Sequence, residues 1–322
     1  MKACPNTSWG NKAVLKDFPT PGLSSREILV KVHASGINRL DILQRLNKYP
    51  PPKKGILGIE VSGVVQTVHP SVTKWRPGDR IMGLTDSGGY AQYAAVHEEL
   101  AMPVPKNIAT EEAAALPEAF LTAFQALFVH GHLKPKQNVL IHAGGSGVGT
   151  AAVQLAHRTK AHVFITAGSE KKIDFCKKLG AASGWNYHKG PFSDFMKKRT
   201  NQKGMDLILD FIGASFFQQN LDLLKEDGTI VCLATLGGSK VSLNLGDLMI
   251  KKGRVIGTTL QDRPLDYKKN LIKKFISFVC PLFEQNLVVP VIDSFFSKDR
   301  IEEAHIRMKE NKNIGKIIIT WM

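Results

Sequence analysis

The chain lacks long hydrophobic runs and a recognisable targeting segment. None of its apolar stretches approaches the roughly 20 residues that a membrane-spanning helix needs. Its first residues contain no hydrophobic signal region, and the acidic Asp17 and Glu27 argue against a transit peptide. We therefore expect a cytoplasmic protein that makes no membrane contact.

Cysteine is scarce and its spacing is uninformative. The four cysteines are far apart, none forms a C-x-x-C pair, and none has a histidine at ligand spacing. This distribution argues against a disulfide scaffold and a cysteine-rich zinc site. The four thiols, which we expect to be reduced, are Cys4, Cys176, Cys232 and Cys280.

Negative charge is in short supply. The 28 acidic residues face 43 lysines and arginines, which leaves a net charge of +15. Such a charge attracts nucleotide phosphates, acidic proteins or nucleic acid. The basic residues occur mostly as scattered pairs, without the interleaved aromatic residues that stack on bases. The pattern favours a solvated lysine-rich surface, so nucleic-acid binding is possible but no motif supports it.

The remaining composition is that of a globular protein with a large core. The 322 residues are 43% hydrophobic and 22% charged, and a chain of this length is typical of two domains. Residues 1–119 are rich in Gly, Pro and β-branched residues, and short strand-like stretches predict a barrel-like β domain. Those stretches are Ile28–His33, Gly63–Val68, Asp79–Leu84 and Tyr90–Val96.

Residues 120–260 alternate between strand and helix patterns, which predicts a parallel sheet with helices on both faces. Residues 261–322 contain a predicted helix near Tyr267–Phe283 and a strand near Lys316–Thr320, and that strand is expected to return to the first domain. In the middle region we expect strands at Val139–His142, His162–Ala167, Leu207–Phe211, Thr229–Ala234 and Val255–Leu260. The helices between them are expected near Gly149–His157, Lys171–Leu179, Ser215–Leu224 and Leu245–Lys251.

The most informative segment is the glycine-rich turn at residues 142–149, with the sequence HAGGSGVG. It follows an apolar strand pattern and precedes a helix pattern. Backbone N–H groups of such a turn can approach a pyrophosphate, and the helix amino terminus carries partial positive charge. The run from Gly144 to Gly149 resembles the dinucleotide motif G-x-G-x-x-G, with Ser146 at its second glycine. The alternative is an ordinary tight turn before a packed helix.

The second strand of this region lacks a carboxylate at its end. NAD-binding folds place an acidic residue there to accept hydrogen bonds from the ribose 2′-OH. Here the strand ends in Thr166, Ala167 and Gly168, after which Ser169 can donate a hydrogen bond and Lys172 can supply positive charge. The pattern favours NADPH over NADH. In the simpler alternative Ser169 caps a helix and Lys172 is a surface lysine.

Motifs spread over nearly the whole chain resemble the zinc-independent quinone oxidoreductase branch of the medium-chain dehydrogenase/reductase superfamily. They include GINRLD at 36–41, ILGIEVSG at 56–63, PGDR at 77–80, GYAQY at 89–93 and NKNIGK at 311–316. Within this branch the glycine turn, TAGS at 166–169 and NKNIGK most resemble the p53-inducible subgroup. The zinc-dependent branch has Cys where this chain has Asn38 and His where it has Ile59. We therefore expect no catalytic metal.

The resemblance implies a fold and a set of roles. The fold is a GroES-like β-barrel-type domain (1–119 and 261–322) joined to a Rossmann doubly wound parallel sheet (120–260). In related proteins the equivalent of Tyr49 lines the substrate site, Asn38 lies near the nicotinamide and Thr122 lies by its ribose. These three are the expected catalytic residues, although a turn-forming Asn, an interfacial Tyr and a Thr bonded to its own helix are the simpler alternatives. The remaining expected cofactor-binding residues are Gly144, Gly145, Ser146, Gly147, Val148, Gly168, Ser169, Lys172, Tyr187, Gly213, Ala234, Gly237, Gly238, Asn313 and Lys316.

The function that the resemblance implies is hydride transfer from NADPH to a quinone without a metal. Two alternatives stay open: reduction of an activated alkene or enoyl thioester on the same fold, and an RNA-binding or structural protein that retains only a cofactor site. The apolar segment Arg254–Leu260 is expected at the edge of the sheet, where an uncovered strand invites pairing. Related enzymes pair this strand with its two-fold copy, so a homodimer is expected.

Overall fold

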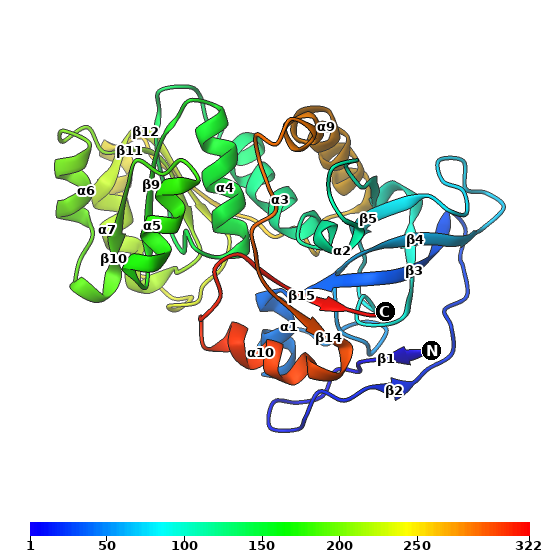
Figure 1. The fold of residues 1–322 in the computed structure, drawn as a ribbon. Helices are drawn as coiled ribbons and strands as arrows, with labels where there is room; N and C mark the ends of the chain where they lie inside the picture. The colour runs from blue at the N-terminus through cyan, green and yellow to red at the C-terminus, as the bar shows by residue number, and fades with distance from the viewer. The chain divides into compact units, whose positions relative to one another are not determined.

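The computed structural model describes residues 1–322 and divides the chain into two compact units (Figure 1). The first unit contains Met1–Leu121 and Gln261–Met322, and the second contains Thr122–Leu260. The predicted division at 119/120 and 260/261 thus lies within two residues of the structural one. The first unit is rich in antiparallel strands and the second is an alternating α/β unit, which confirms the predicted fold class.

The first unit is built on a seven-stranded sheet. Its order is β14-β15-β3-β4-β5-β7, and β6 pairs with β3. A separate short pair, β1 and β2, lies near the amino terminus. The strands are β1 (Lys2–Ala3), β2 (Lys16–Asp17), β3 (Glu27–Gly36), β4 (Glu60–Val68), β5 (Arg80–Leu84), β6 (Tyr93–His97), β7 (Ala101–Pro103), β14 (Ile292–Ser297) and β15 (Lys316–Thr320).

The carboxyl-terminal strand returns to the amino-terminal sheet, as predicted. Strand β15 runs antiparallel to β3, with Ile318 opposite Gly36 and Thr320 opposite Ala34, and Figure 1 shows the two strands side by side. Its three consecutive isoleucines, 317–319, are fully buried, so both faces of the strand are covered. The chain therefore leaves the first unit after residue 121 and completes it only at its end.

Helices cover this sheet and connect its strands. They are α1 (Arg39–Arg45), α2 (Thr110–Ala113), α3 (Pro117–Phe124), α9 (Leu265–Glu284) and α10 (Ile301–Lys309). The first boundary between the units lies within α3. Helix α9 confirms the helix expected near Tyr267–Phe283. No helix combines the length and the continuous apolar character that a bilayer crossing requires.

The second unit is a six-stranded parallel sheet of order β10-β9-β8-β11-β12-β13. This is the 3-2-1-4-5-6 order of dinucleotide-binding folds, in which the strand order reverses beside β8. The strands are β8 (Asn138–Ile141), β9 (His162–Ala167), β10 (Ser183–Asn186), β11 (Met205–Asp210), β12 (Leu224–Cys232) and β13 (Arg254–Gly257). The helices are α4 (Gly147–Arg158), α5 (Glu170–Lys178), α6 (Ser193–Arg199), α7 (Ala214–Leu223) and α8 (Leu245–Ile250), and a π-helix spans Gln125–His130.

In the second unit most strand boundaries agree with the predictions to within a few residues, and strands β12 and β10 differ more. Strand β12 begins at Leu224, five residues before its predicted start. Strand β10 has no predicted counterpart, because its sequence SGWN neither alternates nor forms an apolar run. It nevertheless pairs with the last four residues of β9 and becomes an edge of the sheet.

Candidate functional site

The glycine turn of the second unit connects β8 to α4. Gly144 N–H donates to the Thr166 carbonyl (3.0 Å), which ties the turn to the neighbouring strand β9. Ser146 is the N-cap of α4, and its hydroxyl accepts a hydrogen bond from Gly149 N–H (3.0 Å). The amides of Gly147 and Val148 belong to the first helical turn, where no intrahelical acceptor exists. A helix amino terminus with such donors is an anion site.

Two glycines of the turn are required by close packing. A β-carbon on Gly149 would lie 2.3 Å from the Ala143 carbonyl oxygen, so the helix would have to move away from the turn. A β-carbon on Gly144 would lie 2.9 Å from the side chain of Ile165 in β9. The structure therefore supports the dinucleotide-type turn over a generic one, because these spacings bring the helix start against the sheet.

The residues expected around a 2′-phosphate gather at the carboxyl end of β9. Ser169 is the N-cap of α5 and accepts a hydrogen bond from Lys172 N–H (3.3 Å). The aliphatic part of Lys172 lies over the glycine turn, since a β-carbon on Gly145 would be 3.0 Å from Lys172 Cδ. The hydroxyl of Tyr187 lies over Gly168, where an added β-carbon would be 2.5 Å from it. One serine, one lysine and one tyrosine thus surround a strand end without a carboxylate.

The turns after β11 and β12 also meet at this edge of the sheet. Gly213 has a positive φ of 78°, and a β-carbon there would lie 2.5 Å from the Gly238 carbonyl oxygen. Ala214 N–H donates to that same carbonyl (2.9 Å), and Gly237 N–H donates to the Ile212 carbonyl (2.7 Å). Ala234 follows the end of β12 and is partly exposed. The carboxyl ends of parallel strands are the usual ligand-binding edge.

A buried polar chain next to this edge was not predicted from the sequence. His142 Nδ1 lies 2.8 Å from Thr166 Oγ1, and its Nε2 lies 2.7 Å from Asn220 Oδ1. The Asn220 amide nitrogen donates to Asp210 (3.2 Å), whose other oxygen accepts from the amides of Ile212 (2.7 Å) and Gly213 (3.0 Å). Burial lowers the pKa of His142. These hydrogen bonds link the ends of β8, β9 and β11 to α7. The only sequence signal for them is the position of His142 directly after a strand.

Thr122 lies in helix α3, immediately after the boundary between the units. Its side chain is partly exposed, and the helix around it is largely buried. The structure therefore gives this threonine a helical position, as expected, and its role toward a cofactor stays a prediction.

In the first unit, Asn38 belongs to a buried charged cluster. Lys316 Nζ donates to the Ile37 carbonyl (2.7 Å), to Asn38 Oδ1 (2.7 Å) and to Glu60 Oε1 (2.5 Å). The Asn38 amide nitrogen in turn donates to Glu60 (2.8 Å), whose other oxygen accepts from Glu118 N–H (2.8 Å). All three ammonium hydrogens of Lys316 are therefore used. The predicted contact between Lys316 and a cofactor would require one of these three hydrogen bonds to break.

Asn313 lies three positions before Lys316 in the sequence. It is 5% exposed, and its amide nitrogen donates to the Gly315 carbonyl (2.7 Å), which closes the turn before β15. The structure therefore gives Asn313 a turn-forming position, and its predicted contact with a cofactor stays a prediction.

Asp41 supports the cluster around Lys316. It is fully buried, and one carboxylate oxygen accepts from Asn38 N–H (2.8 Å) and from the Tyr90 hydroxyl (2.8 Å). Burial raises the pKa of Asp41 to about 6, although these two hydrogen bonds act in the opposite direction. Asp41 thus fixes the first turn of α1, and with it the position of Asn38.

Tyr49, the third residue predicted to be catalytic, donates its hydroxyl hydrogen to Asp262 (2.7 Å). Burial raises the pKa of Tyr49 to about 12, and the nearby carboxylate acts in the same direction. Asp262 lies at the start of the segment that returns to the first unit. It was not predicted as a site residue, because the two residues are 213 positions apart and no motif joins them.

The cluster does not suit a tetrahedral zinc ion. Asn38 and Ile59 supply neither a thiolate nor an imidazole, and Glu60 is already paired with the Lys316 ammonium. No group of three or more His, Cys, Asp or Glu side chains in residues 1–322 is arranged to hold a metal.

Two family models match the chain. The alcohol dehydrogenase GroES-like domain matches residues 24–106, and a model described as zinc-binding dehydrogenase matches residues 147–277. The first match lies in the first unit. The second begins at Gly147, in the last part of the glycine turn, covers most of the α/β unit including the end of β9, and extends into α9.

The most similar proteins include the zebrafish and rat synaptic vesicle membrane protein VAT-1 homologues, at 31% and 30% identity over 93% and 94% of this chain. The chain spans 65% and 78% of those two proteins. It is 28% identical to human quinone oxidoreductase, over 99% of this chain and 97% of the relative. A solved quinone oxidoreductase from Thermus thermophilus, described together with its NADPH complex, is 29% identical with a TM-score of 0.84 over 100% of both chains. The fold, the glycine turn and these similarities together show that the chain belongs to the quinone oxidoreductase branch of the medium-chain dehydrogenase/reductase superfamily.

Proposed function

We propose that this protein is an NADPH-dependent quinone reductase. The observation that carries the proposal is the carboxylate-free end of β9, where Ser169, Lys172 and Tyr187 surround one edge of the glycine turn. A cation in place of the usual acid favours a 2′-phosphate. The Thermus relative, which is described with an NADPH complex, supports this choice of cofactor.

The residues of the second unit fit a dinucleotide. The amides of Gly147 and Val148 would receive the pyrophosphate, Ser169 and Lys172 would hold the 2′-phosphate, and Gly213 leaves room at the strand edge. When bound, NADPH supplies the hydride, and a quinone accepts a hydride without a metal.

The polar residues of the first unit are proposed to face the substrate. They are Tyr49 and Asn38, and both side chains are held in place by neighbours. Asp262 accepts from the Tyr49 hydroxyl, whereas Lys316 and Glu60 bond the two ends of the Asn38 amide. A quinone oxygen only accepts hydrogen bonds, so the Tyr49 hydroxyl would have to exchange its bond to Asp262 for one to the quinone. The Asn38 amide nitrogen could donate its second hydrogen while it stays bonded to Glu60, because that hydrogen makes only a long contact with the Gly36 carbonyl (3.4 Å).

The first alternative is a reductase of activated alkenes or enoyl thioesters. A solved enoyl-reductase-type cyclopropanase shares the fold, with a TM-score of 0.87, but at 22% identity this likeness concerns the fold alone. The second alternative is an RNA-binding or structural protein that keeps a cofactor site. We favour quinone reduction because human quinone oxidoreductase matches the chain over almost its full length.

A substrate panel tests the proposed function. The purified protein should oxidise NADPH, followed by its near-ultraviolet absorbance, in the presence of small benzoquinones and naphthoquinones. Faster turnover of 2-enoyl thioesters would favour the first alternative instead. NADPH binding detected by fluorescence, with no turnover of either substrate class, would favour the second.

The choice between NADPH and NADH rests on Lys172. We expect Lys172→Ala to raise the KM for NADPH by about 10- to 100-fold, because a lost charge-assisted hydrogen bond costs about 1.5–3 kcal/mol. The KM for NADH should change less than threefold. Lys171→Ala, which removes the exposed neighbouring charge, is the matched control and should leave both values unchanged. Equal effects of Lys172→Ala on both cofactors would overturn the assignment.

Metal independence follows from Asn38 and Ile59. Prolonged incubation with phenanthroline or EDTA should leave NADPH-dependent turnover intact, because no soft or imidazole ligand occupies these two positions. Activity that disappears with the chelator and returns with added zinc would contradict the prediction.

We further propose that the protein forms a homodimer through the edge of its parallel sheet. Strand β13 pairs with β12 alone, and its sequence RVIG is mostly exposed. Helix α8 ends shortly before it in the chain and exposes Met249 (76%) and Ile250 (78%). An edge strand with unpaired backbone groups beside exposed apolar side chains suits a self-complementary interface.

The interface can be tested by two different changes. Wild-type protein should sediment as a dimer at micromolar concentration. Ile256→Pro, which removes a ladder donor from β13 and disturbs the pairing of this strand, and Met249→Glu with Ile250→Glu, which charges the apolar face, should both yield monomers. Circular dichroism should confirm that the variants remain folded. A monomeric wild type would refute the dimer, and folded variants that stay dimeric would move the interface elsewhere.

A further inference from the structure

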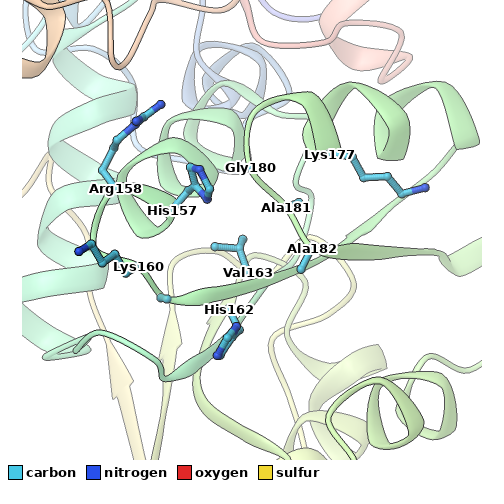
Figure 2. Close-up of a pocket in the computed structure, with 10 residues that line it drawn as sticks. His157, Arg158, Lys160, His162, Val163, Lys177, Gly180, Ala181 and Ala182 are labelled. Atoms are coloured by element: carbon cyan, nitrogen blue, oxygen red, sulfur yellow. The ribbon is translucent and has the colours of Figure 1, made fainter.

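The hollow at the amino end of β9 is lined by basic residues that do not converge on it. Figure 2 shows the charged ends of Arg158, Lys160 and Lys177 pointing in different directions. A ligand in that hollow would therefore meet no common set of donors. The first unit contains a contact of the opposite kind, because the Tyr49 hydroxyl points at the Asp262 carboxylate, 2.7 Å away.

Asp262 lies in a short segment whose backbone is held on both sides. The Gln261 amide nitrogen donates to the Asp86 carbonyl (2.8 Å), in the loop between β5 and β6, and Lys268 Nζ donates to the Gln261 carbonyl (2.7 Å). Lys268 is 5% exposed, so this second bond is shielded from water. Pro264 is the N-cap of α9, and its ring restricts the backbone there. The Asp262 carboxylate therefore has a defined position although its side chain is exposed.

The loop that carries Tyr49 is held as well. Gln44 Nε2 donates to the Pro50 carbonyl (3.0 Å), and Gln44 is a buried residue of α1. Prolines 50–52 follow Tyr49 directly, and they restrict both their own backbone and that of the residue before them. Both partners of the contact between Tyr49 and Asp262 are thus oriented by their own surroundings.

This contact determines what the Tyr49 oxygen offers to a ligand. A phenol has one hydrogen to donate, whereas a carboxylate only accepts. Burial raises the pKa of Tyr49 to about 12, and Asp262 acts in the same direction, so the phenol keeps its hydrogen at neutral pH. That hydrogen is bonded to Asp262, and a bond to a charged acceptor is roughly twice as strong as one to a neutral quinone oxygen. The Tyr49 oxygen is therefore left to act as an acceptor.

We propose that Asp262 is a positioning residue that makes Tyr49 a hydrogen-bond acceptor and thereby selects quinones that carry a hydroxyl substituent. The inference rests on the proposed function, in which Tyr49 faces the substrate. A plain quinone has no hydrogen for the Tyr49 oxygen to accept, so it gains a bond only if the contact with Asp262 breaks. A hydroxyl substituent donates to the Tyr49 oxygen while that contact stays intact.

Two naphthoquinones that differ by one hydroxyl test the proposal, namely 2-methyl-1,4-naphthoquinone and 2-hydroxymethyl-1,4-naphthoquinone. Their affinities for the full-length protein are measured by quenching of tryptophan fluorescence, with saturating NADP⁺ so that no hydride is transferred. The wild type should bind the hydroxymethyl compound about three- to tenfold more tightly, which is the contribution of one neutral hydrogen bond. Asp262→Ala should bring this preference close to unity, because the freed Tyr49 hydrogen can then donate to a carbonyl of either compound.

Asp266 provides a matched control for charge. It is another exposed acidic residue, in the first turn of α9, and it makes no hydrogen bond to Tyr49. Asp266→Ala removes the same charge from the same segment, so it should leave the preference of the wild type unchanged. An equal effect of both substitutions would assign the preference to charge and overturn the proposal.

A positioning role also requires that Asp262 acts through Tyr49. Tyr49→Phe should abolish the preference, and the addition of Asp262→Ala to Tyr49→Phe should then change nothing further. A purely structural contribution of Asp262 would instead weaken the binding of both compounds, in the presence and in the absence of the Tyr49 hydroxyl.

The outcomes separate this role from the proposed function. A wild type that binds both compounds equally, or a preference that survives Asp262→Ala, would overturn the role of Asp262 even if NADPH is oxidised with both quinones. A preference that follows Asp262, without any oxidation of NADPH, would refute quinone reduction and support the selection at Tyr49. Protein that binds neither compound would overturn both.

Discussion

The first unit depends on one buried ion pair, between Lys316 and Glu60. These two side chains are 5% and 0% exposed, and they join the last strand of the chain to β4 across 256 positions of sequence. Two charges withdrawn from water are tolerated only when their remaining hydrogen-bonding capacity is used. Here that requirement is met: the ammonium reaches three oxygens, and Glu60 also accepts from Asn38 and from the Glu118 amide.

This ion pair explains both why the cluster does not suit a zinc ion and why the Asn38 amide has a fixed orientation. Removal of either partner would leave an uncompensated buried charge, at a cost of about 3–5 kcal/mol. The ammonium is therefore already the counter-charge of Glu60, and a zinc ion would have to displace it. The same ammonium fixes the amide orientation of Asn38, because the carbonyl oxygen faces Lys316 and the nitrogen faces Glu60. Asn38 is thus held by its surroundings before any ligand arrives.

Features that depend on local pattern could be predicted from the sequence, whereas features that depend on spatial neighbours could not. The strand–turn–helix at 138–158 has a strong glycine signal, and the return of Lys316–Thr320 was predicted because this strand lies too far along the chain to belong to the parallel sheet. The structure contains both. Strand β10 was not predicted, because its four residues become a strand only where β9 offers a free edge. The link between His142 and Asn220 spans 78 positions, and polar side chains have no period that marks a buried partner. Lys316 was likewise selected from a motif, but the partners that engage its charge depend on which strands become neighbours.

Net charge and cofactor choice are separate properties of this chain. The proposed preference for NADPH depends on the end of strand β9. There the absence of a carboxylate and the presence of Lys172 over Gly145 make the local electrostatic potential more positive. Ten of the fifteen net positive charges fall within residues 122–204, and many of them lie away from that strand end. Because exposed charges more than about 10 Å apart are screened at moderate salt, the unpaired Arg158 and Lys160 at the opposite end of β9 contribute little to the cofactor edge.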